Sequence, residues 1–139
     1  MKKCLKDAAN IQRGYRYAGF FVFERLCLYR DFNMDGDTEG EYYYFPVPEE
    51  YLTKENDIIL RIRGKWDVCI LKKSAEGQVI GAQYIIIRCR SGCSPQHLYE
   101  QISKREFLDR CRKSCRDALN LQQIIKKLGE LKIEISSDE

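Results

Sequence analysis

The chain has one histidine, one tryptophan and three prolines, and it contains no run of about eighteen apolar residues. The lack of such a run excludes a membrane-spanning helix, and the N-terminal lysines are not followed by the apolar segment of a signal peptide. Internal repeats, low-complexity tracts and linker-like stretches are missing too. We therefore expect a cytoplasmic protein that does not enter membranes and that forms one domain over residues 1–139.

The common signatures of catalysis are also missing. There is no glycine-rich phosphate loop, no H-E-x-x-H or G-x-S-x-G motif, and no nuclease-type arrangement of carboxylates and lysine. His97 follows Cys93 by four residues, but a histidine in the first turn of a helix is more often a surface residue than half of a Cys–His pair. We predict no catalytic residue, no cofactor and no enzymatic activity.

The seven cysteines are an odd number, and no secretion signal precedes them. Reduced thiols are the simplest expectation. Two pairs with three intervening residues, Cys89 with Cys93 and Cys111 with Cys115, offer a four-thiolate zinc site as an alternative. We favour packing and predict no metal site, because Cys111 and Cys115 continue the apolar stripe of a helix from Leu108.

The charges are divided unevenly along the chain. From Asp31 to Asp57 there are nine acidic residues and one basic residue, whereas from Arg61 to Lys127 there are fifteen basic and six acidic residues. This division predicts a surface that attracts polyanions. The alternative is that the charges only solvate the faces of strands and helices.

The acidic stretch begins like a calcium-binding loop, with Asp31, Asn33, Asp35 and Gly36. The twelfth position of such a loop supplies a bidentate glutamate, but here it is Tyr42. The flanks, residues 20–28 and 42–45, have the composition of strands rather than helices. We therefore predict an acidic turn between strands.

A two-residue alternation in the centre predicts a hairpin. Ile58, Leu60 and Ile62 alternate with Ile59, Arg61 and Arg63. A second alternating run follows, with Trp66, Val68 and Ile70 on one face. Gly64 and Lys65 between them suit a type II′ turn. The prediction places Arg61 and Arg63 on one face of the hairpin, with Arg63, Lys65 and Trp66 at the tip.

The remaining patterns complete an α+β fold, with a twisted, largely antiparallel β-sheet and C-terminal helices. We predict a helical turn or strand at 5–11, a strand at 78–88, a helix that begins at Pro95 and has Leu98 and Ile102 on one face, helices at about 104–116 and about 121–128, and a strand at 131–135. Ser94 and Asn120 are the expected N-caps, and Gly129 is the expected end of the last helix.

Basic and aromatic residues gather at two places, the glycine-centred loop from Arg13 to Tyr17 and the hairpin. Arginine and lysine neutralise phosphates, arginine also binds guanine edges, and aromatic rings stack on bases. The predicted DNA-binding residues are Arg13, Arg16, Tyr17, Arg61, Arg63, Lys65, Trp66 and Lys72. Ordinary surface charge is the alternative for each loop taken alone.

Four segments, in this order, resemble a target-recognition domain of the specificity subunit of type I restriction–modification enzymes. Residues 5–14 (LKDAANIQRG) are similar to its L-x-D-x-A-x-I-x-x-G opening, and residues 51–64 (YLTKENDIILRIRG) to its Y-L-x-x-G-D-I-L-x-x-R-x-G core. Residues 84–88 with 94–99 (SPQHLY) resemble its strand and P-x-x-L-Y, and residues 120–133 its closing helix and strand.

The resemblance implies a module that recognises half of a split site in double-stranded DNA. It implies methyltransferase and motor-nuclease subunits as partners that carry the chemistry, and self-association or a second half-subunit to complete the site. The alternative is an interaction module, or a remnant, that binds a modification subunit without useful DNA affinity. Asn56 replaces the glycine of the core motif, and we expect neither the family's spacer helix nor a second recognition domain.

Overall fold

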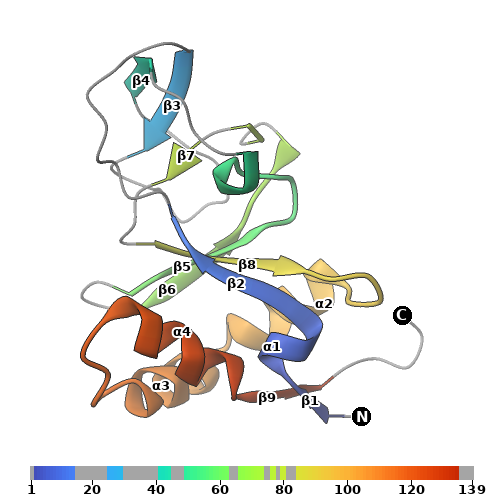
Figure 1. The fold of residues 1–139 in the computed structure, drawn as a ribbon. Coiled ribbons are helices and arrows are strands. Elements are labelled where there is room, and N and C mark those ends of the chain that lie inside the picture. Colours follow the sequence, from blue (N-terminus) through green and yellow to red (C-terminus); the bar gives the residue numbers. More distant parts are fainter. Residues whose placement is uncertain are drawn as a thin grey trace.

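The computed structural model of the chain describes residues 2–14, 25–29, 41–44, 49–62, 66–73, 76–77, 79–80 and 84–134. A four-stranded antiparallel sheet lies at its centre, in the order β2-β8-β5-β6. Its strands are β2 (Ala9–Arg13), β8 (Tyr84–Cys89), β5 (Ile58–Arg61) and β6 (Asp67–Ile70). Figure 1 shows helices on one side of this sheet and a smaller sheet on the other.

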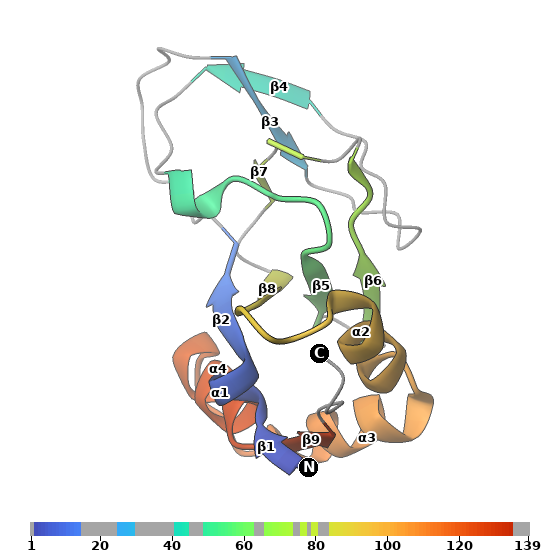
Figure 2. The same ribbon diagram turned by 90° about the vertical axis from the view of Figure 1, so that its right-hand side faces the viewer.

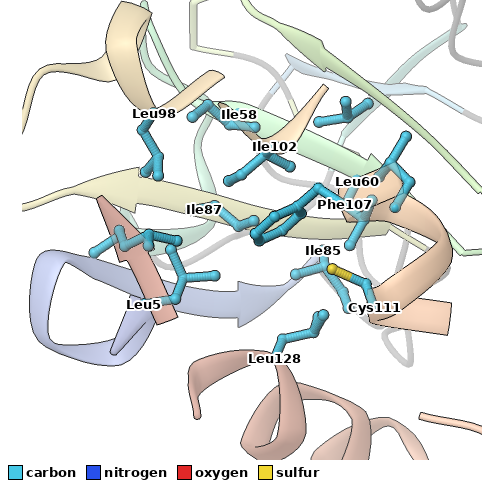
Figure 3. Close-up of a cluster of buried hydrophobic side chains, with 14 of the residues drawn as sticks. Leu5, Ile58, Leu60, Ile85, Ile87, Leu98, Ile102, Phe107, Cys111 and Leu128 are labelled. Carbon is cyan, nitrogen blue, oxygen red and sulfur yellow. The ribbon is translucent and has the colours of Figure 1, made fainter. Parts of the chain in front are cut away.

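Helices cover one face of the central sheet. They are α1 (Leu5–Ala8), α2 (Pro95–Ile102), α3 (Arg105–Ser114) and α4 (Leu121–Gly129). Alternate strand residues such as Ile58, Leu60 and Ile87 point into the helix-side core, where they meet Leu98 and Phe107 (Figure 3). Each such side chain, when fully buried, contributes about 1.5–3 kcal/mol of transfer free energy, so this cluster dominates the stability of the fold.

The other face of the central sheet is buried as well. Ile59, Tyr84 and Ile86 form a second cluster with Ile80, which belongs to β7 (Val79–Ile80). The small sheet has the order β4-β3-β7, in which β3 (Arg25–Tyr29) pairs antiparallel with β4 (Glu41–Tyr44) and parallel with β7. A single 3₁₀ turn, η1 (Glu49–Tyr51), comes before β5.

The first and last described strands pair with each other. β1 (Lys2–Cys4) is antiparallel to β9 (Lys132–Glu134), with Lys2 opposite Glu134. The outer edge of β9 is covered by Gln101 of α2, whose side-chain amide exchanges two hydrogen bonds with the backbone of Glu134, at 3.0 and 2.6 Å. Figure 2 shows β1 and β9 below the central sheet, beside the helices.

The α+β fold predicted from the sequence is confirmed, together with both N-caps. Ser94 Oγ accepts a hydrogen bond from the backbone of His97 at 3.3 Å, and Asn120 Oδ1 accepts one from Gln123 at 3.0 Å. Gly129 is the last residue of α4, as predicted, but its φ is not left-handed, and Glu130 caps the helix with ordinary αR geometry. Within the described ranges, no helix has the length and apolar character needed to cross a membrane.

Two predictions of strand geometry were wrong. The predicted strand 78–88 is in fact β7 and β8, which belong to different sheets. The central hairpin exists, but Arg61 pairs with Asp67, whereas an unbroken ladder around a two-residue turn at Gly64 and Lys65 pairs Arg61 with Val68. The turn predicted at Gly64 and Lys65 itself lies outside the described residues.

Candidate nucleic-acid interface

Arg13 and Arg61 end their strands at the same end of the central sheet. Arg13 lies opposite Ile85 and Arg61 lies opposite Tyr84, so the two arginines flank neighbouring positions of β8. Ile85 belongs to the helix-side core and Tyr84 to the other core. Because partners in a ladder share a face, the two arginines lie on opposite faces, and the structure does not bring them onto one flat surface.

Arg61 forms an ion pair that is open to solvent. Its Nη2 lies 3.8 Å from Oδ2 of Asp67, and the side chains are 37% and 40% exposed. A pair this open to solvent contributes little to folding, typically below about 1 kcal/mol, and is easily exchanged for a phosphate. Arg13 is half-buried at the end of β2, just before the buried Gly14, whose N–H donates to the Tyr84 carbonyl at 2.9 Å.

Trp66 is not the exposed aromatic residue that the hairpin pattern predicted. Its side chain is 7% exposed and belongs to the helix-side core, because residue 66 shares a face with Val68. Its backbone carbonyl accepts a hydrogen bond from Nη1 of Arg105 at 3.0 Å. The prediction that this ring stacks on bases was therefore wrong, and its large apolar area stabilises the fold instead.

Lys72 is exposed but lies at the other end of the hairpin from Arg61. It follows Leu71, whose N–H donates to the Asp57 carbonyl at 2.8 Å, next to the start of β5. The other predicted DNA-binding residues, and the calcium-like acidic turn, lie outside the described residues: Arg16, Tyr17, Arg63, Lys65 and positions 31–36.

A buried ion pair holds the segment before β5 against β8. The carboxylate of Asp57, which is 1% exposed, accepts bonds from Nε and Nη2 of Arg88 at 2.8 and 2.7 Å. It also accepts the Lys54 N–H at 2.9 Å, and Arg88 donates to the Leu52 carbonyl at 3.0 Å. The hydrogen bonds to Asp57 raise the pKa of Arg88, although partial burial opposes this.

Asn56 adopts a left-handed conformation at the position where the core motif has glycine. Its φ is 72°, in the left-handed region that glycine adopts without strain. Asparagine tolerates this conformation better than other residues with a Cβ. The replacement of glycine at this position therefore preserves the turn that delivers Asp57 to Arg88.

The C-terminal half of α3 and the turn after it carry a cationic surface that the sequence patterns did not single out. Arg112, Lys113 and Arg116 line a hollow of ≈ 440 Å³ together with Asp109. None of these three cations forms a salt bridge with any other residue that the structure describes. The run Arg110-Cys111-Arg112-Lys113 was visible in the sequence, but helical charge is usually only a solvated face.

The cysteines do not form a metal site among the residues that the structure describes. No group of three or more His, Cys, Asp or Glu side chains there is arranged to hold an ion. Cys111 and Cys115 are buried in the helix-side core, as their stripe predicted. Burial raises the pKa of Cys111 to about 12, with a further contribution from Cys115. By contrast, Sγ of Cys89 lies 2.9 Å from Sγ of Cys93.

These features define a class of fold: an α+β domain whose antiparallel sheet carries C-terminal helices on one face. The crystal structure of the HsdS subunit from Thermoanaerobacter tengcongensis has a similar fold, with a TM-score of 0.63 and 13% sequence identity. The match covers 96% of this chain and 32% of that one, so the chain spans about a third of the length of that subunit. By sequence, the chain matches no known protein family and no curated protein.

Proposed function

We propose that this chain is a DNA-recognition module that works like one target-recognition domain of a type I restriction–modification specificity subunit. The observation that carries the proposal is the fold shared with HsdS, a subunit of that kind, over 96% of the chain. The module spans residues 1–139, binds half of a split duplex site in the cytoplasm and catalyses no reaction itself. Methyltransferase and motor-nuclease subunits, and a second copy or half-subunit, are the partners that the proposal implies.

The positions of Arg13 and Arg61 determine how duplex DNA approaches. The two residues lie on opposite faces of the sheet, with one strand between them, so their Cα atoms are about 10 Å apart. Both faces of the sheet are covered by other elements, so a duplex cannot lie flat on either of them. A duplex that crosses the end of the sheet reaches both, because the DNA is wider than this separation. We therefore propose an end-on approach, with Arg16, Tyr17, Arg63 and Lys65 as further contacts.

The test compares two double variants, each of which removes two positive charges at a different place in the fold. Duplex binding is measured by fluorescence anisotropy over a range of salt concentrations, for the unmodified chain, Arg13→Ala/Arg61→Ala and Arg112→Ala/Arg116→Ala. We expect the first variant to bind more weakly and to lower the slope of log affinity against log salt by about 2, one for each lost phosphate contact. The second variant leaves that slope unchanged.

If Arg112→Ala/Arg116→Ala lowers the slope and Arg13→Ala/Arg61→Ala does not, the DNA contact lies at α3 and not at the end of the sheet. If the unmodified chain binds no duplex at low salt, DNA recognition itself is wrong.

One observation favours an alternative function as an interaction module. Trp66 is buried and Lys72 lies at the far end of the hairpin. The predicted DNA-binding residues are therefore more dispersed than tight DNA binding requires. A module of this kind binds a modification subunit without useful DNA affinity. Co-purification with a methyltransferase subunit by a chain that does not bind duplex DNA is the result that distinguishes it.

A further inference from the structure

Cys89 and Cys93 lie at a tight bend between the central sheet and α2. Cys89 is the last residue of β8, and Cys93 comes just before Ser94, the N-cap of α2. Between them the Cys93 N–H donates to the Arg90 carbonyl at 3.1 Å, and Gly92 has a φ of 87°. These features are those of a type II turn with glycine at its third position. The turn brings the two Sγ atoms to 2.9 Å.

A path from solvent leads to this pair. The side chains of Cys89 and Cys93 are only half-buried. Cys89 also lines a hollow of ≈ 290 Å³ that Lys54, Asn56 and Pro95 border. A small thiol reagent can therefore reach the sulfur of Cys89 without unfolding of the helix-side core.

The second cysteine pair provides an internal comparison with the same spacing. Cys111 and Cys115 are also separated by three residues, yet they are 2% and 7% exposed. Burial raises the pKa of both thiols, so the reactive thiolate is scarce at neutral pH. Sequence spacing alone treats the two pairs alike, whereas the folded structure exposes one pair and protects the other.

We propose that Cys89 and Cys93 form a dithiol modification site that low-molecular-weight disulfides, such as glutathione disulfide, oxidise to an intramolecular disulfide. The thiolate of one cysteine attacks the reagent, forms a mixed disulfide and releases one glutathione thiolate. The second cysteine then attacks the mixed disulfide as a thiolate and releases the second glutathione. The protein loses two electrons and two protons, and the reagent becomes two molecules of glutathione. This modification does not depend on the proposed DNA-recognition function.

The disulfide covalently joins the end of β8 to the residue before the N-cap of α2. The joint lies beside the Asp57–Arg88 ion pair, because Arg88 immediately precedes Cys89. Oxidation therefore fixes the bend that connects the central sheet to its first covering helix. We expect the melting temperature of the chain to rise on oxidation and to return when dithiothreitol is added.

The experiment follows the disulfides by mass spectrometry. The reduced full-length chain is incubated with glutathione disulfide, quenched in acid, alkylated after unfolding and mapped by peptide. In the native chain we expect the Cys89–Cys93 disulfide to form at least about tenfold faster than the Cys111–Cys115 disulfide. In urea the two rates converge, because the two pairs have the same spacing. The variant Cys93→Ser leaves Cys89 as a mixed disulfide with glutathione.

Three outcomes overturn the proposal. Cys89 and Cys93 remain reduced in the native chain, the two pairs oxidise at equal rates there, or Cys89 forms its disulfide with a different cysteine. Because Cys93→Ser changes a half-buried side chain, its folding is checked by circular dichroism. The comparison of the two pairs within the unmodified chain needs no variant at all.

Discussion

At the residue scale, the carboxylate of Asp57 closes its own turn by accepting the Lys54 N–H and joins that turn to Arg88 of β8. With 1% of its surface exposed, this carboxylate has no access to water as a replacement partner. Buried ion pairs of this kind contribute little compared with apolar residues of the same size, but the loss of one partner leaves a buried charge. The pair therefore has its largest effect on stability when one of its two partners is removed.

We predict that Arg88→Ala lowers the free energy of unfolding by about 3–5 kcal/mol, because it leaves the Asp57 charge buried with a single N–H donor. Urea denaturation at neutral pH measures this change. The matched control is Arg61→Ala, which breaks an arginine–aspartate pair that is about 40% exposed and costs less than about 1 kcal/mol. Equal losses in the two variants would contradict the structural role of the buried pair.

At the scale of secondary-structure elements, the contact between α1 and α4 depends on a residue without a side chain. A Cβ on Gly129 would lie 3.0 Å from Cβ of Lys6 and 3.6 Å from Cδ1 of Ile11. Glycine is therefore present for the close approach of two elements and not for a left-handed turn. Local sequence rules treat a glycine at the end of a helical pattern as a stop, so this packing role was not predictable from the pattern.

We predict that Gly129→Val destabilises the chain by about 1–3 kcal/mol, because a branched side chain overfills the space between α4 and α1. Thermal unfolding followed by circular dichroism measures the change. Gln122→Val places the same side chain on the exposed face of the same helix and shifts stability by less than about 0.5 kcal/mol. A neutral Gly129→Val variant would show that α4 moves away from α1 without cost.

Local sequence patterns predicted those elements whose capping and periodicity depend only on neighbouring residues. The caps at Ser94 and Asn120, the helices and the alternation of β5 are all encoded within a few residues. The separation of β7 from β8 was not encoded in this way. β7 pairs with the distant β3 in parallel, and such long-range pairing leaves no mark in the apolar run itself.

At the scale of the whole molecule, the candidate site was only partly predictable. The alternation of β5 correctly placed Arg61 away from the helix-side core, but the same rule applied to β6 places Trp66 within it. The relation between Arg13 and Arg61 depends on the order of three strands, which no local pattern contains. Charge counts along the chain therefore predicted a polyanionic ligand but could not locate a surface for it.

The burial of Cys111 makes the stability of the whole domain sensitive to alkaline pH. Its pKa is raised from 9.0 to about 12, so the folded chain holds the proton while the unfolded chain releases it. The contribution of this thiol is therefore fully present below about pH 9 and is lost as the pH rises toward 12. We predict that the stability difference between the unmodified chain and Cys111→Ala shrinks by up to about 1.4 kcal/mol per pH unit above 9.

Urea denaturation at pH 8, 9 and 10 on the two chains measures this difference. Leu108→Ala is the matched control, since it removes a buried, uncharged side chain from the same helix. Its cost should not vary with pH relative to the unmodified chain. A difference for Cys111→Ala that is equally constant would contradict the protonated state of the buried thiol.

The pairing of β1 with β9 has a topological consequence. The polypeptide enters and leaves the domain side by side, with Lys2 directly opposite Glu134. A domain built in this way can be tethered at a single point, because the chain at Lys2 and the chain at Glu134 lie at the same corner. Two such units fused in tandem, or one unit inserted into a host loop, therefore keep both cores intact without any strand having to span the domain.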